Sequence, residues 1–244
     1  MNTVPAIGLR ERKRLQTRQL IQLAAQRLFE ERGFDAVSVA EIARAADFSE
    51  MTVFNHFPTK EDLVFSRMES FEDRLLEAIR QRPEGETAIA AFRRAVLGGT
   101  EHQLATPEAA AAIGRAARLI SSSRALQNRE REVVARHAEA LAHLLAEEAG
   151  RPEHDLEAAA VANALMSTHA ALVALVRTQV LAGVAGDALA AGVRAQARRA
   201  FARLEEGLAD YGARNPKARR RVATIRDLPQ VTTKPIEVSQ EGKS

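Results

Sequence analysis

Cysteine and tryptophan are absent from the 244 residues, and tyrosine occurs once. Without cysteine the chain has no disulfide framework, no thiolate nucleophile and no cysteine-based zinc site. This absence suits the reducing cytoplasm, where we expect the protein to reside. Aromatic residues make up only 4% of the sequence, which argues mildly against a binding site built as a flat stacking cage.

Long hydrophobic runs are also missing. The longest one, Ala170 to Val176, falls far short of the roughly 20 apolar residues of a membrane span. The N-terminus has no apolar h-region of the kind found in export signals. We therefore expect neither secretion nor a membrane partner.

Catalytic and metal-binding motifs are absent as well. The sequence contains no Gly-x-Ser-x-Gly elbow, no Walker loop and no His-Glu-x-x-His. His137 and His143 lie six positions apart, which places them about 240° apart around a helix and makes them a poor chelate. An enzyme is the rival class, suggested only by Ser121 to Ser123, six histidines and many carboxylates; we expect no enzyme, cofactor or metal site.

The residues that are abundant, alanine, leucine, arginine and glutamate, predict an all-α protein with room for a small domain and a larger one. The net charge of +3 is unevenly distributed. Eight basic and three acidic residues from Arg214 onward give +5 and leave about −2 for the rest. Net charge is therefore no evidence for nucleic acid, and only local placement is informative.

Two basic clusters flank the predicted helices. We expect residues 1–14, with Arg10, Arg12, Lys13 and Arg14, to form an arm along a minor groove or phosphate backbone; a frayed solubilising tail is the alternative. Residues 214–244 are rich in proline and basic residues and have little apolar periodicity. We predict a disordered basic tail there, either merely solvated or adding nonspecific DNA affinity.

Helix-start signals lie close together between residues 38 and 63. Ser38 followed by Glu41 has the pattern of a capping box and predicts a short helix from about residue 39. Ser49 repeats the cap before a helix of about two turns, which must end at Phe57 because Pro58 disfavours helical geometry in the residue before it. The spacing describes two short helices joined by a tight turn.

A longer helix precedes this pair, and another follows it. The apolar residues of the longer, preceding helix recur at helical spacing, and Gly33 ends that helix. Thr59, opposite Asp62, caps a helix predicted to run to about Arg80. The three helices ending at residue 57 are expected to share one small core of Ile21, Ala24, Ala25, Leu28, Phe29, Phe34, Val37, Val39, Ile42, Ala43, Ala46, Val53 and Phe57.

The helix after Ser49 divides into two unlike sides. Val53 and Phe57 face inward, whereas Thr52, Asn55 and His56 remain outside as short polar groups. A solvated helix more often carries lysine and glutamate, and short hydrogen-bonding side chains fit a DNA major groove. Any small helical bundle would share the caps and the stripe, so this polar side is what favours DNA.

These residues resemble the DNA-binding domain of the tetracycline-repressor (TetR) family of bacterial transcriptional regulators. The resemblance runs from Thr17 to about Leu63, roughly the first quarter of the chain; the remainder fits only in its all-helical layout. The matching motifs are Ala24-Ala25-x-x-Leu28-Phe29, Gly33-Phe34, Val39-x-Glu41-Ile42-Ala43, Ser49, Thr52-Val53-Phe54-x-His56-Phe57 and Lys60-Glu61-x-Leu63.

The resemblance implies which residues meet DNA. Thr52, Phe54 and Asn55 would approach bases or sugar-phosphate, and His56 and Lys60 would hold phosphates, Lys60 because it stands at a helix start. Glu50 is either stabilised by the helix dipole at the helix start or accepts a hydrogen bond from a cytosine amino group. The full predicted set is Thr17, Ser38, Glu50, Met51, Thr52, Phe54, Asn55, His56 and Lys60.

Two positions depart from the family's pattern. Phe54 stands where the family usually has tyrosine, so a phenolic contact is lost and an apolar contact with a thymine methyl or sugar remains possible. The operator sequence therefore does not transfer from relatives. Asp47 stands where glycine is usual in the turn, and aspartate tolerates the left-handed backbone region better than most residues.

Residues 15–60 are assigned to the helix-turn-helix domain and residues 61–213 to a helical domain for effector binding and dimerisation. Helices are expected over 59–80, 86–97, 108 onward, 124–148, 153–181 and 187–211, with a break at Gly98-Gly99. The last two are rich in alanine, and the resemblance implies that they meet a second copy in a four-helix interface. A GC-rich genome is the other explanation for the alanine.

Polar residues in the second domain are candidates for the few polar contacts of an apolar effector cavity, although core packing or interhelical hydrogen bonding explains them equally. They are His102, Arg115, Arg118, Asn163, Met166 and His169, with Arg118 the choice for an anionic ligand. The sequence predicts a dimeric repressor released from a palindromic operator by a small apolar molecule. The alternative is an effector-independent activator or architectural DNA-binding protein.

Overall fold

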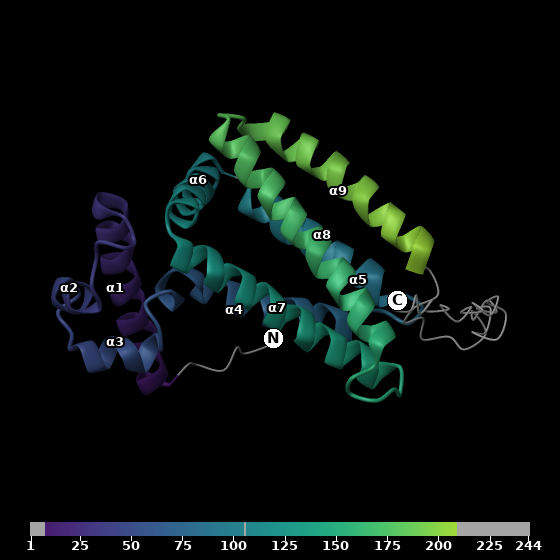
Figure 1. Cartoon of the computed structure of the whole chain (residues 1–244), viewed down its shortest axis with the longest axis horizontal. Helices are drawn as coiled ribbons and strands as arrows, with labels where there is room; N and C mark the ends of the chain where they lie inside the picture. Colours follow the sequence, from purple (N-terminus) through teal and green to yellow (C-terminus); the bar gives the residue numbers. More distant parts are fainter. Residues whose placement is uncertain (1–7, 105, 209–244) are drawn as a thin grey trace, which may run out of the picture.

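The computed structural model describes residues 8–104 and 106–208, apart from the side chains of 67–70 and 72, and these residues form helices without any strand. The all-α prediction is confirmed. The helices are α1 (Leu9–Arg32), α2 (Val39–Ala45), α3 (Glu50–His56), α4 (Asp62–Arg80), α5 (Ala88–Gln103), α6 (Pro107–Ser122), α7 (Arg124–Glu148), α8 (Leu156–Leu181) and α9 (Gly186–Leu208) (Figure 1).

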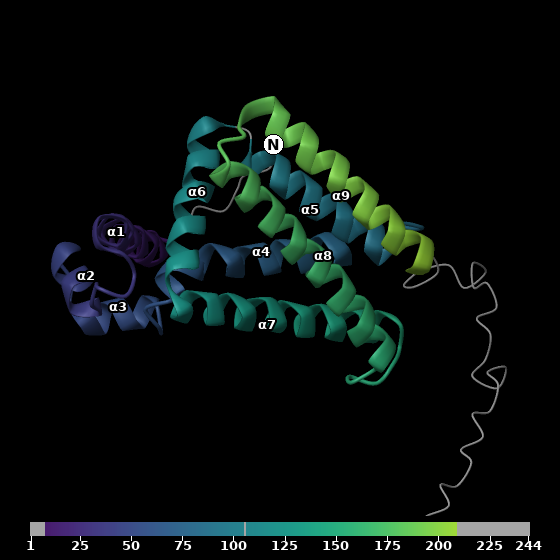
Figure 2. The ribbon, with the colours of Figure 1, turned by 45° about the horizontal axis from the view of Figure 1, so that its top comes forward.

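The helices form a small unit and a larger one. Helices α1 to α3 lie together at one end of the molecule, and α4 leads from them into the larger domain (Figures 1 and 2). Helix α8 packs against α7 on one side and α9 on the other. This is an N-terminal helix-turn-helix domain followed by a helical domain.

The capping residues and Pro58 predicted the bounds of the short helices α2 and α3 correctly. The capping box at the start of α2 is complete: the Glu41 backbone N–H donates to Ser38 Oγ at 3.2 Å, and the Ser38 N–H donates to Glu41 Oε2 at 2.8 Å. Helix α3 ends at His56, and Phe57 is extended with φ −141°. Thr59 and Asp62 exchange the predicted hydrogen bonds, but α4 begins at Asp62 itself, after a turn.

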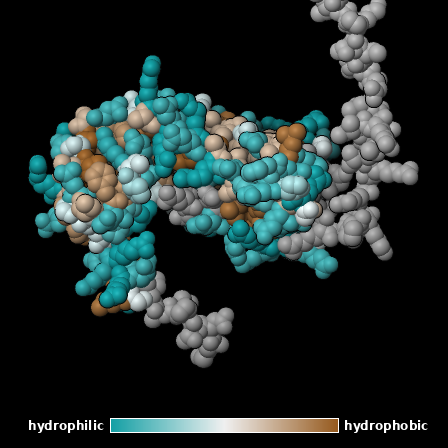
Figure 3. Space-filling view, turned by 60° about the horizontal axis from the view of Figure 1, so that its bottom comes forward, coloured by the Kyte–Doolittle hydropathy of each residue, from teal (hydrophilic) through white to brown (hydrophobic). Residues whose placement is uncertain are grey.

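The predicted N-terminal arm is wrong over its described part. Helix α1 begins at Leu9, so the four basic residues between Arg10 and Arg14 occupy its first turns. Arginine, lysine, leucine and glutamine are good helix formers, and no glycine or proline interrupts them before Gly33. Figure 3 shows these turns as a hydrophilic projection beside the body. The predicted tail, residues 214–244, lies outside the described residues.

The predicted break at Gly98-Gly99 is also wrong, because α5 continues through both residues to Gln103. Two interior glycines cost the helix about 1 kcal/mol each. Val96 before them and Leu104 after them are both buried in the core, and this packing outweighs the local preference. The other differences are smaller: α8 begins at Leu156, capped by Asp155, and α9 is described to Leu208.

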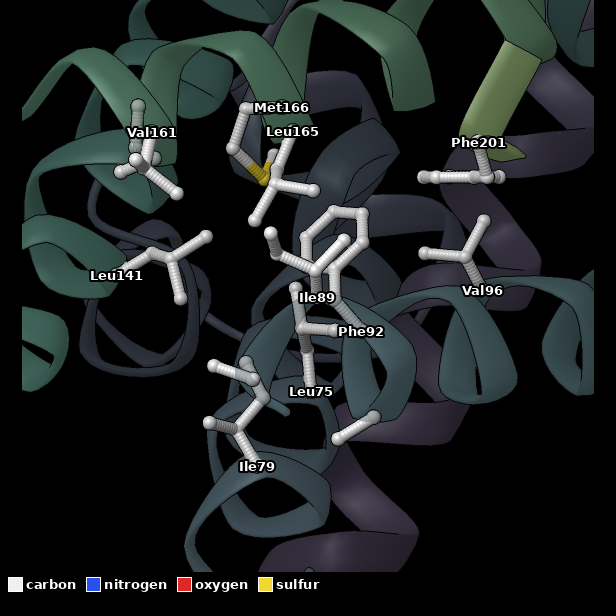
Figure 4. Packing of buried hydrophobic residues seen from close by; sticks show 14 of the residues in the cluster. Leu75, Ile79, Ile89, Phe92, Val96, Leu141, Val161, Leu165, Met166 and Phe201 are labelled. Atoms are coloured by element: carbon white, nitrogen blue, oxygen red, sulfur yellow. The ribbon is translucent and has the colours of Figure 1, made fainter. Parts of the chain in front are cut away.

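Two hydrophobic cores hold the molecule together. The larger core joins α4, α5, α7, α8 and α9, and its side chains point toward one another in Figure 4, among them Phe92 and Phe201 with ring centroids 6.0 Å apart. The smaller core contains the predicted residues of α1 to α3 except Ala24, which is buried but lies outside this cluster. It also takes in Ile120, Leu126 and Val133 from α6 and α7, so packing crosses the predicted boundary at residue 60.

Helix α8 differs from the sequence-based expectation in its apolar character. Among the described residues it is the one helix long and apolar enough, by length and composition, to cross a membrane, although only 33% of its most apolar stretch is buried. A few polar residues interrupt every run, which hides this character in the sequence. Apart from Glu157 in the first turn, the exposed residues repeat every three or four positions: Leu156, Ala160, Asn163, Ser167, Ala171, Ala174, Thr178 and Leu181.

Candidate nucleic-acid interface

Helix α3 has the two sides that the sequence predicts. Val53 is buried inside, as is Phe57 directly after the helix, whereas Met51 is 69% exposed and Phe54 44% exposed. Asn55 and Glu50 are also exposed, and Thr52 and His56 are half-buried. The exposed side therefore carries hydrogen-bonding groups next to two large apolar ones, a mixture suited to base edges and thymine methyl groups.

The start of α3 is held by Ser49. Its Oγ accepts from the Thr52 N–H at 3.1 Å and lies 2.8 Å from the Thr52 hydroxyl. This second contact limits the rotation of the Thr52 side chain before any DNA is bound. A side chain already ordered in the free protein loses less entropy when it meets a base.

The turn before α3 survives without glycine. Asp47 adopts φ 60°, in the left-handed region, and the Phe48 N–H donates to the Ala43 carbonyl at 2.9 Å. The prediction that aspartate takes this conformation is confirmed. The angle between α2 and α3 therefore rests on a residue type that adopts this geometry more readily than most.

Helix α1 braces the end of α3 through Arg18, a role that the sequence did not suggest. One Arg18 Nη donates to the His56 carbonyl at 2.6 Å, and the guanidinium lies 4.3 Å from the centre of the Phe57 ring. Burial lowers the pKa of His56, and the charges of Arg14 and Arg18 lower it further. His56 is therefore neutral at pH 7 and would meet a phosphate as a hydrogen-bond donor.

Lys60 lies further inside than its predicted phosphate contact requires. Its Nζ donates to the Phe34 carbonyl at 2.6 Å and stands 4.1 Å from the centre of the Phe34 ring. Burial lowers its pKa, although nearby carboxylates, Asp35 first, act in the opposite direction. In the free protein this lysine ties the segment after α1 to the start of α4, and its phosphate contact stays a prediction.

The remaining predicted DNA contacts, Ser38 and Thr17, lie outside α3. Ser38 is exposed at the start of α2, and Thr17 is half-buried on α1, one residue before Arg18. Both are short hydroxyl side chains, of the kind that donates to phosphate oxygens. Their contacts with DNA also stay predictions.

The DNA-binding domain is docked on the corner between α6 and α7 by polar contacts that the sequence did not reveal. Ser123 Oγ donates to Asp35 Oδ1 at 2.8 Å, and Arg129 Nη2 donates to Asp62 Oδ1 at 2.7 Å. A more exposed pair joins Arg115 of α6 to Glu30 of α1 at 2.9 Å. The corner therefore touches α1, the loop after it and the first turn of α4.

Asp62 is the most enclosed of these carboxylates. Burial acts to raise its pKa, but hydrogen bonds from Thr59 and Arg129 outweigh that effect, and the pKa is lowered. The pKa of Arg129 is raised, chiefly by its hydrogen bond to Asp62. Both groups are charged at neutral pH, and a charge this enclosed depends strongly on its partner.

The six predicted effector residues do not form one site. Met166 is buried, and His169 packs against Phe71 with ring centroids 4.7 Å apart. The others lie elsewhere: Asn163 is exposed and donates to the Ala159 carbonyl of its own helix, Arg115 pairs with Glu30, and His102 and Arg118 are exposed. Helical phase explains the split on α8, because Asn163 belongs to the exposed stripe and Met166 and His169 to the opposite side.

A buried histidine that the sequence did not single out as an effector contact lies beside His169. His137 of α7 is 2% exposed, and its ring centre is 6.4 Å from that of Phe71. Burial lowers the pKa of both histidines to about 4. Two neutral imidazoles therefore stand within the core of the second domain.

We expect these histidines to make folding stability depend on pH. Unfolded histidine titrates near 6.5, so stability is full above that pH and falls as the pH drops toward 4, where the folded histidines would take up protons. Between pH 6.5 and 5 the loss is on the order of 2 kcal/mol for each buried histidine. Urea unfolding at several pH values measures this loss. His169→Phe should remove about half of it, because His137 remains, whereas Gln103→Ala, which removes no titrating group, leaves the curve unchanged.

Two short helices at a tight turn, docked on a helical domain, define a helix-turn-helix protein. Residues 21–66 match the family described as "Bacterial regulatory proteins, tetR family". Over 94 residues the chain is 35% identical to the HTH-type transcriptional regulator TcmR of Streptomyces glaucescens, covering 37% of this chain and 42% of TcmR. The family match covers the helix-turn-helix domain, and the chain matches less than half the length of this curated relative.

Solved structures share the fold over most of the chain. A TetR-family regulator from Streptomyces coelicolor superposes with a TM-score of 0.53 at 22% identity, covering 80% of this chain and 96% of that one. NalD of Pseudomonas aeruginosa, the secondary repressor of the MexAB-OprM multidrug efflux pump, gives 0.51 at 20% identity with the same coverages. At these identities the likeness concerns the fold alone.

Proposed function

We propose that this regulator is a cytoplasmic dimeric repressor that holds a palindromic operator and releases it when a small, largely apolar molecule binds the second domain. The observation that carries the proposal is the exposed side of α3. Asn55 and Thr52 stand there beside Met51 and Phe54, on a helix that its cap and its bracing arginine hold in place. Such a helix presents base-reading groups to a major groove.

The exposed stripe of α8 supports the dimer. Its small residues let another helix approach closely, and a second copy would cover the apolar surface that the chain itself leaves open. Helix α9 packs beside it and carries exposed alanines of its own, including Ala188, Ala191 and Ala195. Two-fold pairing would set two recognition helices on half-sites about 34 Å apart, or a multiple of that distance.

The helical form of the basic cluster changes its proposed contact. An α-helix with its side chains is about 10 Å across, whereas the minor groove is only about 6 Å wide. The first turns of α1, with exposed Arg10, Arg12, Lys13 and Arg14, would therefore follow the phosphate backbone beside the major groove that α3 occupies. They would add affinity that depends on salt but not on sequence.

The docking contacts suggest how a ligand would reach the DNA. An effector must bind the released state more tightly than the operator-bound state, because only that difference shifts the equilibrium. Helix α4 runs from the small core into the large one, and the α6–α7 corner holds the DNA-binding domain at Asp35 and Asp62. A shift of α4 against α7 would therefore change the spacing of the two recognition helices.

The proposal is tested by selecting bound duplexes from genomic fragments and then measuring affinity against salt for wild type and for Thr52→Ala/Asn55→Ala. Each base contact is worth about 1–3 kcal/mol, so we expect a palindrome whose affinity falls at least a hundredfold in the double variant. The salt slope should stay the same, because neither substituted side chain carries a positive charge. Gln103→Ala, exposed at the end of α5, is the control and should bind like wild type.

Weak binding that ignores sequence and is unaltered by the double variant would contradict the proposal. In that case the basic turns of α1 would be the main DNA contact, and substituting them would reduce the salt slope. The same experiment thus separates sequence reading by α3 from general attraction to phosphate.

A further inference from the structure

A buried nitrogen in the second domain has no hydrogen-bond partner among the described residues. It is Nδ1 of His169 on α8, and although the residue as a whole is only half-buried, this atom is shielded from water. Phe71 of α4 stacks on the imidazole, with ring centroids 4.7 Å apart and planes 12° from parallel. Met166 and Leu172 on the same helix belong to the surrounding hydrophobic core.

Folded proteins rarely leave such an atom without a partner. A buried polar group that gives up water and gains no hydrogen bond keeps its whole desolvation penalty, which an apolar side chain of similar shape would avoid. Phenylalanine would stack on Phe71 as well as histidine does. Among the described side chains nothing meets this nitrogen, and a bound molecule would.

We propose that the effector is a small lipophilic molecule with an uncharged hydroxyl, an alcohol or a phenol, and that it binds between α4, α7 and α8 with this hydroxyl on His169 Nδ1. This inference rests on the proposed function and adds the ligand class and the anchoring atom. The walls of the site are Phe71, His137 and His169, which come from those three helices.

The choice of a hydroxyl as the ligand group follows from the protonation state of the two imidazoles. Burial holds the pKa of His137 and His169 near 4, so neither ring offers a positive charge to a carboxylate at pH 7. A neutral imidazole carries its proton on one of its two nitrogens, so Nδ1 is a donor in one tautomer and an acceptor in the other. A hydroxyl both donates and accepts, and it satisfies either tautomer.

The position of Phe71 gives binding a mechanical consequence. A hydroxyl meets His169 Nδ1 in the plane of the imidazole, so a ligand there would lie at the edge of the stacked pair, against the Phe71 ring of α4. The first turn of the same helix is anchored at Asp62 to Arg129 of α7, the helix that also carries His137. A ligand between α4 and α7 therefore pushes apart the two elements that hold the DNA-binding domain.

An open hollow elsewhere is less suited to this role. It lies where α5 ends and α9 begins, has an accessible volume of about 210 Å³, and is lined partly by Glu101, Asp187 and Arg194. Glu101 and Arg194 already pair across it at 2.7 Å. A hollow that is smaller than typical ligand pockets and rimmed by charges does not fit a lipophilic molecule.

Binding is tested on the full chain without DNA, using 4-propylphenol, propylbenzene and 4-propylbenzoate as probes. Long-range proton–nitrogen NMR spectra follow the imidazole nitrogens, and calorimetry gives the affinities. We expect 4-propylphenol to shift the His169 nitrogen signals and to bind at least tenfold more tightly than either of the other probes. In His169→Phe, which keeps the stacked ring, that preference over propylbenzene should disappear, whereas exposed His154→Asn should keep it.

Equal binding of 4-propylphenol and propylbenzene to the wild type would overturn the site, as would no binding of any probe. Tighter binding of 4-propylbenzoate, or an undiminished preference in His169→Phe, would overturn it as well. Operator release is then measured separately by adding 4-propylphenol to the protein–DNA complex. Release in wild type but not in His169→Phe supports the site, whereas loss of operator binding in every sample would count against the proposed function and not against the site.

Discussion

Ala174→Arg on α8 should convert the protein to a monomer at micromolar concentration and weaken operator binding at least a hundredfold. Ala174 lies in the exposed stripe of small residues, where a second copy would leave no room for a guanidinium. Each subunit would contribute one such charge, so the interface would enclose two like charges without partners, each costing several kcal/mol. A monomer then meets one half-site and loses the contribution of the second.

Sedimentation velocity measures the oligomeric state, and fluorescence anisotropy with a labelled operator measures the affinity. Ala135→Arg is the matched control, because it places the same side chain at an exposed alanine of α7, outside the stripe. It should remain a dimer and bind as wild type does. A dimeric Ala174→Arg with full affinity would show that the stripe is not the interface.

Asp62→Asn should cost about 3 kcal/mol of unfolding free energy and much of the operator affinity, because it removes the enclosed counter-charge of Arg129 and leaves only the exposed Glu132, at 3.2 Å. Only 8% of the Asp62 side chain and 21% of the Arg129 side chain are exposed, so water replaces the lost partner poorly. The carboxylate also accepts from the Thr59 N–H at 2.9 Å, so the start of α4 loosens too. The DNA-binding domain would lose one of its anchors on α7.

Urea unfolding of Asp62→Asn, Arg129→Met and the double variant forms a thermodynamic cycle for this pair. We expect the double variant to be less damaged than the sum of the single changes, since neither charge is then left alone. Arg203→Met is the control, because its ion pair with Glu206 is exposed on both sides and such pairs contribute about 0–1 kcal/mol. Additive effects of the single changes would show that the pair is not coupled.

The sequence predicts well those features that depend on interactions between residues close together in the chain. Ser38 and Ser49 cap helices through hydrogen bonds to residues three positions later, and Pro58 acts on the residue before it. Asp47 adopts its left-handed angle within a single turn. Helix α3 and its exposed side follow from these local rules, and the family resemblance rests on the same stretch.

Longer-range packing explains what the sequence left open. Helix α5 passes through two glycines because buried residues on both sides stabilise it, and no local signal reports that burial. The contacts of Ser123 with Asp35 and of Arg129 with Asp62 join residues 88 and 67 positions apart. Lys60 had a plausible exposed role as a helix-start lysine, and only the fold shows it turned toward Phe34.

The small core also bears on how this regulator can be divided or recombined. Ile120, Leu126 and Val133 complete the packing around Leu63 and Phe65, so a fragment ending near residue 66 would leave apolar surface open to water. Exchanging only the first 66 residues with another regulator would join two half-cores whose shapes did not evolve together. A working chimera would have to transplant the α6–α7 corner together with α1, α2 and α3. The exchangeable unit is therefore not one continuous stretch of sequence.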